Sequence, residues 1–183
     1  LINDLAATAY AIPFLGPEAF AVIQTGIPVN AARISVVSAG TGLGQAFLVS
    51  DKNGKYIVMD SEGGHCDFSP RNEQESELLF FLQKKYSRVG IERVLSGPGL
   101  LDIYGFFKAT EDEAVDSPVA IVERAIAKTS PVCEKTIELF ISLYGALAGN
   151  LALQYLSDGG VYLGGGIAPK IVALLQEGGF MEA

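Results

Sequence analysis

The chain has 183 residues, of which 49% are hydrophobic and 19% charged, the balance of one folded globular domain rather than of a disordered or fibrous chain. The formal net charge is -8 and the 13 lysines and arginines form no run, which excludes the positive surface that nucleic acids require. No apolar run has the length of a membrane span and no signal-like stretch is present, so the sequence predicts a cytoplasmic protein without membrane or nucleic-acid partners.

The first third of the sequence predicts one helix followed by three strands. The helix begins at residue 3 or 4 and continues to about residue 14, and the prolines and glycines of residues 11–32 predict a surface connection. Runs rich in Val, Ile, Phe and Tyr predict strands at residues 33–38, 45–50 and 55–60. Turn residues at 51–54 predict a hairpin between the last two strands.

The rest of the sequence is mainly helical, with single strands between the helices. Apolar residues at helical spacing predict helices at residues 73–86, 99–107, 118–128, 131–156 and 167–176. Short apolar runs predict strands at residues 91–95 and 161–163. Strands first, then helices interleaved with single strands, predict a mixed α/β domain.

Two glycine-rich segments follow predicted strands. Gly40-Thr41-Gly42-Leu43-Gly44 lies between two strands and fits neither the dinucleotide fingerprint nor the P-loop. Its backbone amides and the Thr41 hydroxyl suit phosphate oxygens in an acidic chain, although a hairpin turn without a ligand explains the same residues. Gly164-Gly165-Gly166 precedes a predicted helix, which indicates either close approach of the backbone to a ligand or a plain turn.

The segment Glu62-Gly63-Gly64-His65 contains the only histidine of the chain. The two glycines remove side-chain bulk, so the carboxylate and the imidazole are able to converge on a small polar ligand. Both groups form good hydrogen bonds with hydroxyls. The alternative is a structural histidine in a turn.

Two further carboxylates are candidates. Asn3 and Asp4 lie at a helix start, where they either cap the helix or present a carboxylate that accepts a proton from a substrate hydroxyl. Glu92 is an isolated charge in an apolar run, where it either pairs with Arg88 or Arg93 or binds a ligand.

Five segments, taken in this order, resemble the bacterial ATP-dependent glucokinase family over nearly the whole chain. They are Leu1-Ile2-Asn3-Asp4, Ala39-Gly40-Thr41-Gly42-Leu43-Gly44, Glu62-Gly63-Gly64-His65-Cys66-Asp67-Phe68, Glu92-Arg93-Val94-Leu95-Ser96-Gly97-Pro98-Gly99-Leu100 and Leu163-Gly164-Gly165-Gly166-Ile167. The resemblance implies the actin-like ATPase (ribonuclease H-like) fold of sugar kinases, with two α/β domains and the active site between them. Residues 1–183 then correspond mainly to the larger domain, truncated at both ends.

The resemblance also implies a role for each candidate residue. Asp4 is expected to be the general base on the glucose 6-hydroxyl, and the other hydroxyls are expected to bind Asn3, Glu62, His65 and Glu92. ATP phosphates are expected at Gly40, Thr41, Gly42 and Gly44, and the adenosine at Gly164, Gly165 and Gly166. ATP and Mg²⁺ are the implied cofactors, with no metal ligand in this chain, and a homodimer is the implied assembly.

The sequence departs from the family where the phosphates and Mg²⁺ are concerned. The family's Asp-x-Gly-Gly-Thr segment is absent from these residues, and the chain stops at Ala183, where the family continues with further helix. We therefore expect weak or no kinase activity from this chain alone. A sugar-binding regulatory or assembly module without catalysis is the main alternative, and a purely structural fragment is another.

A repressor-related sugar kinase is a weaker alternative, because that group follows its Glu-x-Gly-His with a cysteine-rich zinc motif. The cysteines of this chain are Cys66 and Cys133. They lie far apart and lack Cys-x-x-Cys spacing, which predicts reduced thiols rather than a disulfide or a zinc site.

Overall fold

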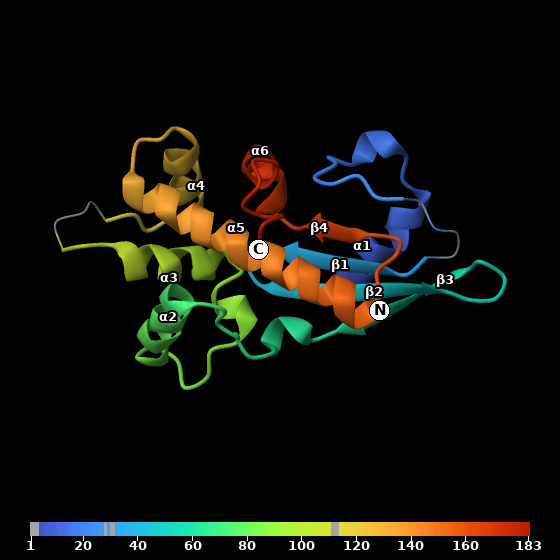
Figure 1. Ribbon diagram of the computed structural model, residues 1–183, viewed down its shortest axis with the longest axis horizontal. Coiled ribbons are helices and arrows are strands. Elements are labelled where there is room, and N and C mark those ends of the chain that lie inside the picture. Colours follow the sequence, from blue (N-terminus) through green and yellow to red (C-terminus); the bar gives the residue numbers. More distant parts are fainter. Residues whose placement is uncertain (1–3, 28, 30–31, 111–113) are drawn as a thin grey trace.

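The computed structural model describes residues 4–27, 29, 32–110 and 114–183. A four-stranded sheet lies at one end of the molecule and a group of helices at the other, and the long helix α5 runs across both (Figure 1). The helices are α1 (Asp4–Ala11), α2 (Glu73–Gln83), α3 (Gly97–Phe107), α4 (Pro118–Ile126), α5 (Pro131–Tyr155) and α6 (Val172–Leu175). The strands are β1 (Ile34–Ala39), β2 (Leu43–Ser50), β3 (Tyr56–Ser61) and β4 (Val161–Gly164).

The sheet has the order β3-β2-β1-β4. β2 pairs antiparallel with both β1 and β3, whereas β4 pairs parallel with β1. The predicted hairpin between β2 and β3 is confirmed, because the Asp51 side chain accepts hydrogen bonds from the amides of Asn53 and Lys55 at 2.8 and 2.9 Å. The parallel pair places the ends of β1 and β4 at one edge of the sheet.

Alternating side chains give the sheet two apolar faces. One face packs on α1 through a small cluster made of Ala9, Ile12, Ile34, Val36, Ala46 and Leu48. The opposite face contributes Val37, Leu43 and Phe47 to the main core, which continues through α3, α4 and α5. The sheet therefore fixes α1 on one side and the helical part of the molecule on the other.

Helix α5 is the central element of the core. Ser130 caps it by accepting a hydrogen bond from the Cys133 amide, with Pro131 in the first turn, and it ends at Leu156 in the left-handed conformation. Its length and composition alone would suit a membrane span, but 56% of its most apolar stretch is buried inside the protein. Phe140 and Tyr144 are fully buried, and the Tyr144 hydroxyl donates to the Val37 carbonyl of β1.

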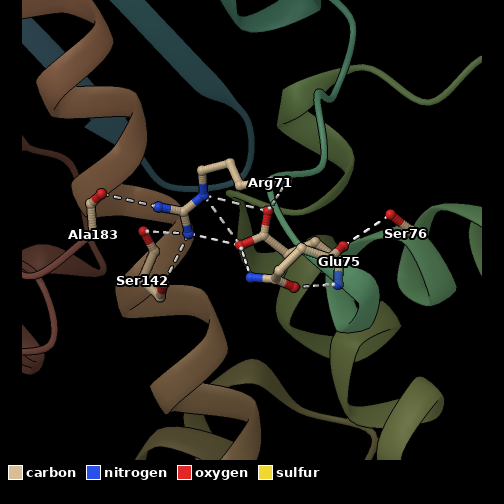
Figure 2. Close-up of polar contacts among 6 residues, drawn as sticks. Arg71, Glu75, Ser76, Ser142 and Ala183 are labelled. Atoms are coloured by element: carbon tan, nitrogen blue, oxygen red, sulfur yellow. Dashed lines mark hydrogen bonds and ion pairs between the residues drawn. The ribbon is translucent and has the colours of Figure 1, made fainter.

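Arg71 joins the start of α2 to α5. Its guanidinium donates to the buried Glu75 carboxylate at 2.6 Å, to the Ser142 hydroxyl at 2.8 Å and to the Ala183 carbonyl at 3.2 Å (Figure 2). The Arg71 amide also donates to Glu75, at 2.8 Å. The buried carboxylate is thus paired and hydrogen-bonded, as a charge in a core must be.

Three predicted elements differ from those in the structure. The strand predicted at residues 91–95 is wrong, because Ile91–Arg93 form a 3₁₀ turn whose Ile91 carbonyl accepts from the amides of Val94 and Leu95. The helix predicted at residues 167–176 is divided into a 3₁₀ turn, Ala168–Lys170, and α6, because Ile171 has non-helical angles. The first helix changes to 3₁₀ geometry at Ile12–Phe14, where Pro13 has no amide to donate.

Candidate active site

The two glycine-rich segments lie side by side because β1 and β4 are parallel neighbours. Ser38 of β1 pairs with Gly164 of β4, and the Ile167 amide donates to the Ala39 carbonyl at 3.2 Å. A Cβ atom on Gly40 would lie 3.9 Å from the Gly166 amide nitrogen. Ligands of open α/β sheets bind outside the carboxyl ends of parallel strands, and both glycine segments occupy that position.

Gly165 needs its glycine for two reasons. Its φ is +84°, which an L side chain rarely adopts, and a Cβ atom there would overlap the Ala39 carbonyl. Gly166, in contrast, has open space where a side chain would be. The segment is therefore shaped by its close packing on β1 and leaves room at Gly166.

A cavity of about 410 Å³ joins the predicted phosphate and sugar residues. The turn from Gly40 to Gly44 forms one wall and the side chains of Glu62, His65 and Glu92 form another. The lining is completed by Leu5 and Thr8 of α1 and by Ser38 of β1. The segment Gly164–Gly166 does not line this cavity, although Gly166 lies next to Gly40. The cavity thus brings together the predicted phosphate residues Gly40, Thr41, Gly42 and Gly44 with Glu62, His65 and Glu92.

His65 stands between two carboxylates. Its Nε2 atom lies 3.7 Å from Glu62 Oε2 and its Nδ1 atom 3.9 Å from Glu92 Oε1. Both separations are too long for direct hydrogen bonds. The exposed fractions of the side chains fall from 88% for Glu62 to 64% for His65 and 27% for Glu92. Glu92 is therefore the least exposed of the three side chains.

The turn that carries Glu62 and His65 is seated directly on β2. A Cβ atom on Gly64 would overlap the Leu43 carbonyl, and one on Gly63 would overlap the buried Gln45 amide. The His65 amide donates to the Glu62 carbonyl at 2.9 Å, which closes the turn. The two glycines serve close packing against β2, a reason that sequence reasoning had not identified.

Glu92 does not form the ion pairs that sequence reasoning offered as its alternative. Arg88 pairs with Asp67 at 2.6 Å, and the Arg93 guanidinium lies over the Tyr86 ring. Glu92 Oε2 instead accepts a hydrogen bond of 3.0 Å from the Leu43 amide, inside the glycine turn. This contact makes Glu92 part of both walls of the cavity.

The proton acceptor proposed from the sequence lies at the edge of the described structure. Asp4 is the first residue of α1, and Leu5 and Thr8 of the same helix line the cavity. Asn3 lies outside the described residues, so the position of its side chain and its capping role stay predictions. Thr8 was missed by sequence reasoning; it lies about one helical turn after Asp4 along α1.

No group of three or more His, Cys, Asp and Glu side chains that could hold a metal ion occurs in the described part of the chain. In the cavity, the carboxylates of Glu62 and Glu92 flank an imidazole rather than facing each other. These residues suit hydroxyl groups better than Mg²⁺, which prefers several oxygen ligands in octahedral geometry.

The solved structures that resemble this one define the class of fold. A glucokinase from an Antarctic psychrotroph matches with a TM-score of 0.89 and 36% identity, over 99% of this chain and 56% of that one. A glucokinase from Balamuthia mandrillaris, crystallised with glucose, matches with a TM-score of 0.76 and 24% identity, over 100% and 57% of the two chains. The mixed sheet with flanking helices is thus the actin-like ATPase fold of sugar kinases.

Sequence comparison narrows this class to one family. The glucokinase family model matches residues 1–183. Glucokinases from Synechocystis and Nostoc punctiforme are each 42% identical, over 100% and 99% of this chain. The chain belongs to the glucokinase family. It spans 58% of the length of the Synechocystis protein and 60% of the Nostoc protein.

Proposed function

We propose that this chain provides the glucose-binding and proton-accepting part of an enzyme that phosphorylates glucose with ATP. The product is glucose 6-phosphate, the entry compound of glycolysis. The observation that carries the proposal is the single cavity in which the glycine turn meets Glu62, His65 and Glu92. Membership of the glucokinase family supports it. A ROK family glucokinase from Streptomyces griseus, which has a similar fold, was crystallised with glucose and AMPPNP, and this complex is consistent with the two proposed ligands.

The reaction needs alignment and charge stabilisation more than covalent help. The glucose 6-oxygen forms a bond to the γ-phosphorus of ATP while the bond from that phosphorus to the ADP oxygen breaks. Asp4 takes the proton of the 6-hydroxyl, as a general base does. Backbone amides of the turn, with the Thr41 hydroxyl, stabilise the charge on the phosphate oxygens.

The remaining polar groups hold the sugar. Glu62 and Glu92 accept hydrogen bonds from hydroxyls, and His65 between them is able to donate or accept. A sugar that lacks or inverts one of these hydroxyls leaves a polar group unpaired, which costs about 1 to 3 kcal/mol. Selectivity for glucose follows from this fit. Gly164–Gly166 remain our candidates for contact with the adenosine.

Mg²⁺ is proposed to enter with the nucleotide, on the phosphate oxygens. The described residues provide no group of three or more His, Cys, Asp and Glu side chains that could hold it. When bound, the ion neutralises charge on the transferred phosphoryl group. We also infer a cytoplasmic location from Cys66 and Cys133, which are both free thiols, and a homodimer stays a prediction.

Two measurements on the 183-residue chain test the proposal. We expect calorimetry to show glucose binding, and a coupled ADP-release assay to show weak or no turnover, because the sequence has no Asp-x-Gly-Gly-Thr segment. Glucose binding without any nucleotide binding favours the alternative, a sugar-binding module. Absence of glucose binding contradicts the proposed function.

A further inference from the structure

We propose that Glu92 couples the two halves of the site, so that glucose strengthens nucleotide binding. The inference rests on the proposed function. One oxygen of its carboxylate accepts a hydrogen bond from the Leu43 amide of the glycine turn, at 3.0 Å. The other oxygen lies 3.9 Å from His65 Nδ1, on the sugar side of the cavity. One side chain thus contacts the phosphate half and the sugar half at the same time.

The backbone around Glu92 makes the same two connections. Ile91 donates its amide to the Cys66 carbonyl at 2.8 Å, beside His65. Gly97 donates its amide to the Gly40 carbonyl at 2.7 Å, at the start of the glycine turn. The Ser96 hydroxyl donates to the Glu92 carbonyl at 2.7 Å, which holds the residues between these points. Residues 91–97 therefore form a bridge from the sugar-binding turn to the phosphate-binding turn.

The position of the Glu92 carboxylate leaves little freedom to the turn. A Cβ atom on Gly42 would lie 2.8 Å from Glu92 Oε2, so the carboxylate lies against the backbone there. The hydrogen bond occupies the Leu43 amide, and the Gly40 amide is occupied by the Gly42 carbonyl at 2.9 Å. The turn thus binds phosphate with a carboxylate at its base.

The charge of Glu92 gives the coupling its sign. A carboxylate at the base of an anion-binding turn repels phosphate, and the repulsion is larger in a partly buried site than in water. A glucose hydroxyl that donates to Glu92 Oε1 draws the negative charge toward the sugar and away from the turn. Glucose should therefore raise the affinity of the turn for nucleotide, and nucleotide must raise glucose affinity by the same factor.

The test measures this coupling factor in three proteins. AMPPNP with Mg²⁺ is titrated into the chain by calorimetry, with and without saturating glucose. We expect glucose to tighten AMPPNP binding at least about fivefold in the unaltered chain, the lower end of usual coupling factors. In Glu92→Gln the amide oxygen is still able to accept from Leu43 but carries no charge, so AMPPNP should bind tighter without glucose and respond less than about twofold to it.

Glu62→Gln is the matched control. It removes the same charge from the same cavity and from the same histidine, 3.7 Å away, but Glu62 holds no amide of the glycine turn. Both variants should weaken glucose binding, and Glu62→Gln should keep the coupling factor of the unaltered chain. Equal loss of coupling in the two variants overturns the role of the Leu43 contact.

A second readout uses the unaltered chain and does not depend on the folding of a variant. Glucose alone should shift the NMR resonance of the Leu43 amide proton, because its acceptor changes charge distribution. An unmoved Leu43 resonance at saturating glucose contradicts the coupling. Two calorimetric outcomes also contradict the coupling: both ligands bind and neither changes the affinity of the other, or glucose binds and AMPPNP does not. Each of these outcomes leaves the proposed glucose binding intact. Binding of neither ligand contradicts both proposals.

Discussion

At the scale of single residues, steric fit decides which positions of the site tolerate change. Gly64 is buried, and a Cβ atom there would overlap the Leu43 carbonyl. Backbone atoms of a paired strand do not move aside as a flexible side chain does, so the turn that carries Glu62 and His65 must shift.

Gly64→Ala should therefore lower the free energy of unfolding by about 1 to 3 kcal/mol, the usual cost of overpacking, and weaken glucose binding. Urea unfolding and calorimetry measure the two effects. Gly149→Ala is the control, because its Cβ atom meets nothing within 4 Å and alanine favours helix. Similar behaviour of the two variants would refute the steric argument.

Asp4 is the second single residue whose replacement should change the site. If it is the general base, Asp4→Asn should lower the turnover number about 10²- to 10⁴-fold and change glucose affinity little. Turnover is measured in a chimera in which the Synechocystis relative supplies the rest of its own length. The Thr8→Val change, four residues further along α1, serves as a comparison that keeps the carboxylate. Equal losses in both variants would count against a special role of Asp4.

At the scale of elements, buried and exposed ion pairs should differ sharply. The Glu75 carboxylate has no exposed surface, and Arg71 holds it against α5 (Figure 2). Arg71→Met leaves that charge unpaired, which should cost about 3 to 5 kcal/mol of unfolding free energy.

Arg88→Met is the control, because Arg88 and Asp67 are both exposed, with side-chain fractions of 65% and 72%. Its cost should stay below about 1 kcal/mol. The double change Arg71→Met with Glu75→Gln should recover part of the loss, since the unpaired charge is gone. Chemical denaturation of the three variants at pH 7 measures these differences, and equal costs for the two single changes would be inconsistent with the argument.

The ion pair between Arg33, just before β1, and Asp158, just before β4, should make the free energy of unfolding depend on pH. Hydrogen bonds from the Arg33 side chain and amide lower the pKa of Asp158 below its usual value of 3.8. A lowered pKa in the folded state gives stability that is present above pH 4 or so and is lost as the pH falls through the folded pKa. Asp158→Asn should therefore flatten the fall of the urea midpoint below about pH 4. An unchanged pH profile would contradict this contribution.

At the scale of the whole molecule, ligand binding should be visible as thermal stabilisation. A ligand that binds only the folded state at 100 times its Kd adds about 2.7 kcal/mol, which for a chain of this size raises Tm by about 5 to 10 °C. We expect glucose to do so and galactose, with one inverted hydroxyl, to raise Tm much less. Calorimetric melts measure both, and equal shifts would remove the basis for sugar selectivity.

The sequence alone determined the local features, because these depend on neighbouring residues. Periodicity located α2, α3, α4 and α5, the turn chemistry at Asp51 located the hairpin, and the glycine segments were located by composition. The pairing of β4 with β1 could not be predicted from the sequence, because it joins residues more than 120 positions apart. Residues 91–95 were misread because a short buried apolar run has the same pattern as a strand or a 3₁₀ turn.

For the candidate site too, the sequence identified the residue types and the tertiary structure decided their arrangement. Glu62, His65 and Glu92 were found as chemically suitable side chains, and the resemblance assigned Asp4 its expected role. Tertiary structure decided that the predicted phosphate turn and the predicted sugar-binding residues share one cavity, and that Glu92 bonds to Leu43 rather than to an arginine. Residue types reveal which groups are able to bind a hydroxyl or a phosphate, whereas only the packing of β2 against residues 91–97 determines which of them meet.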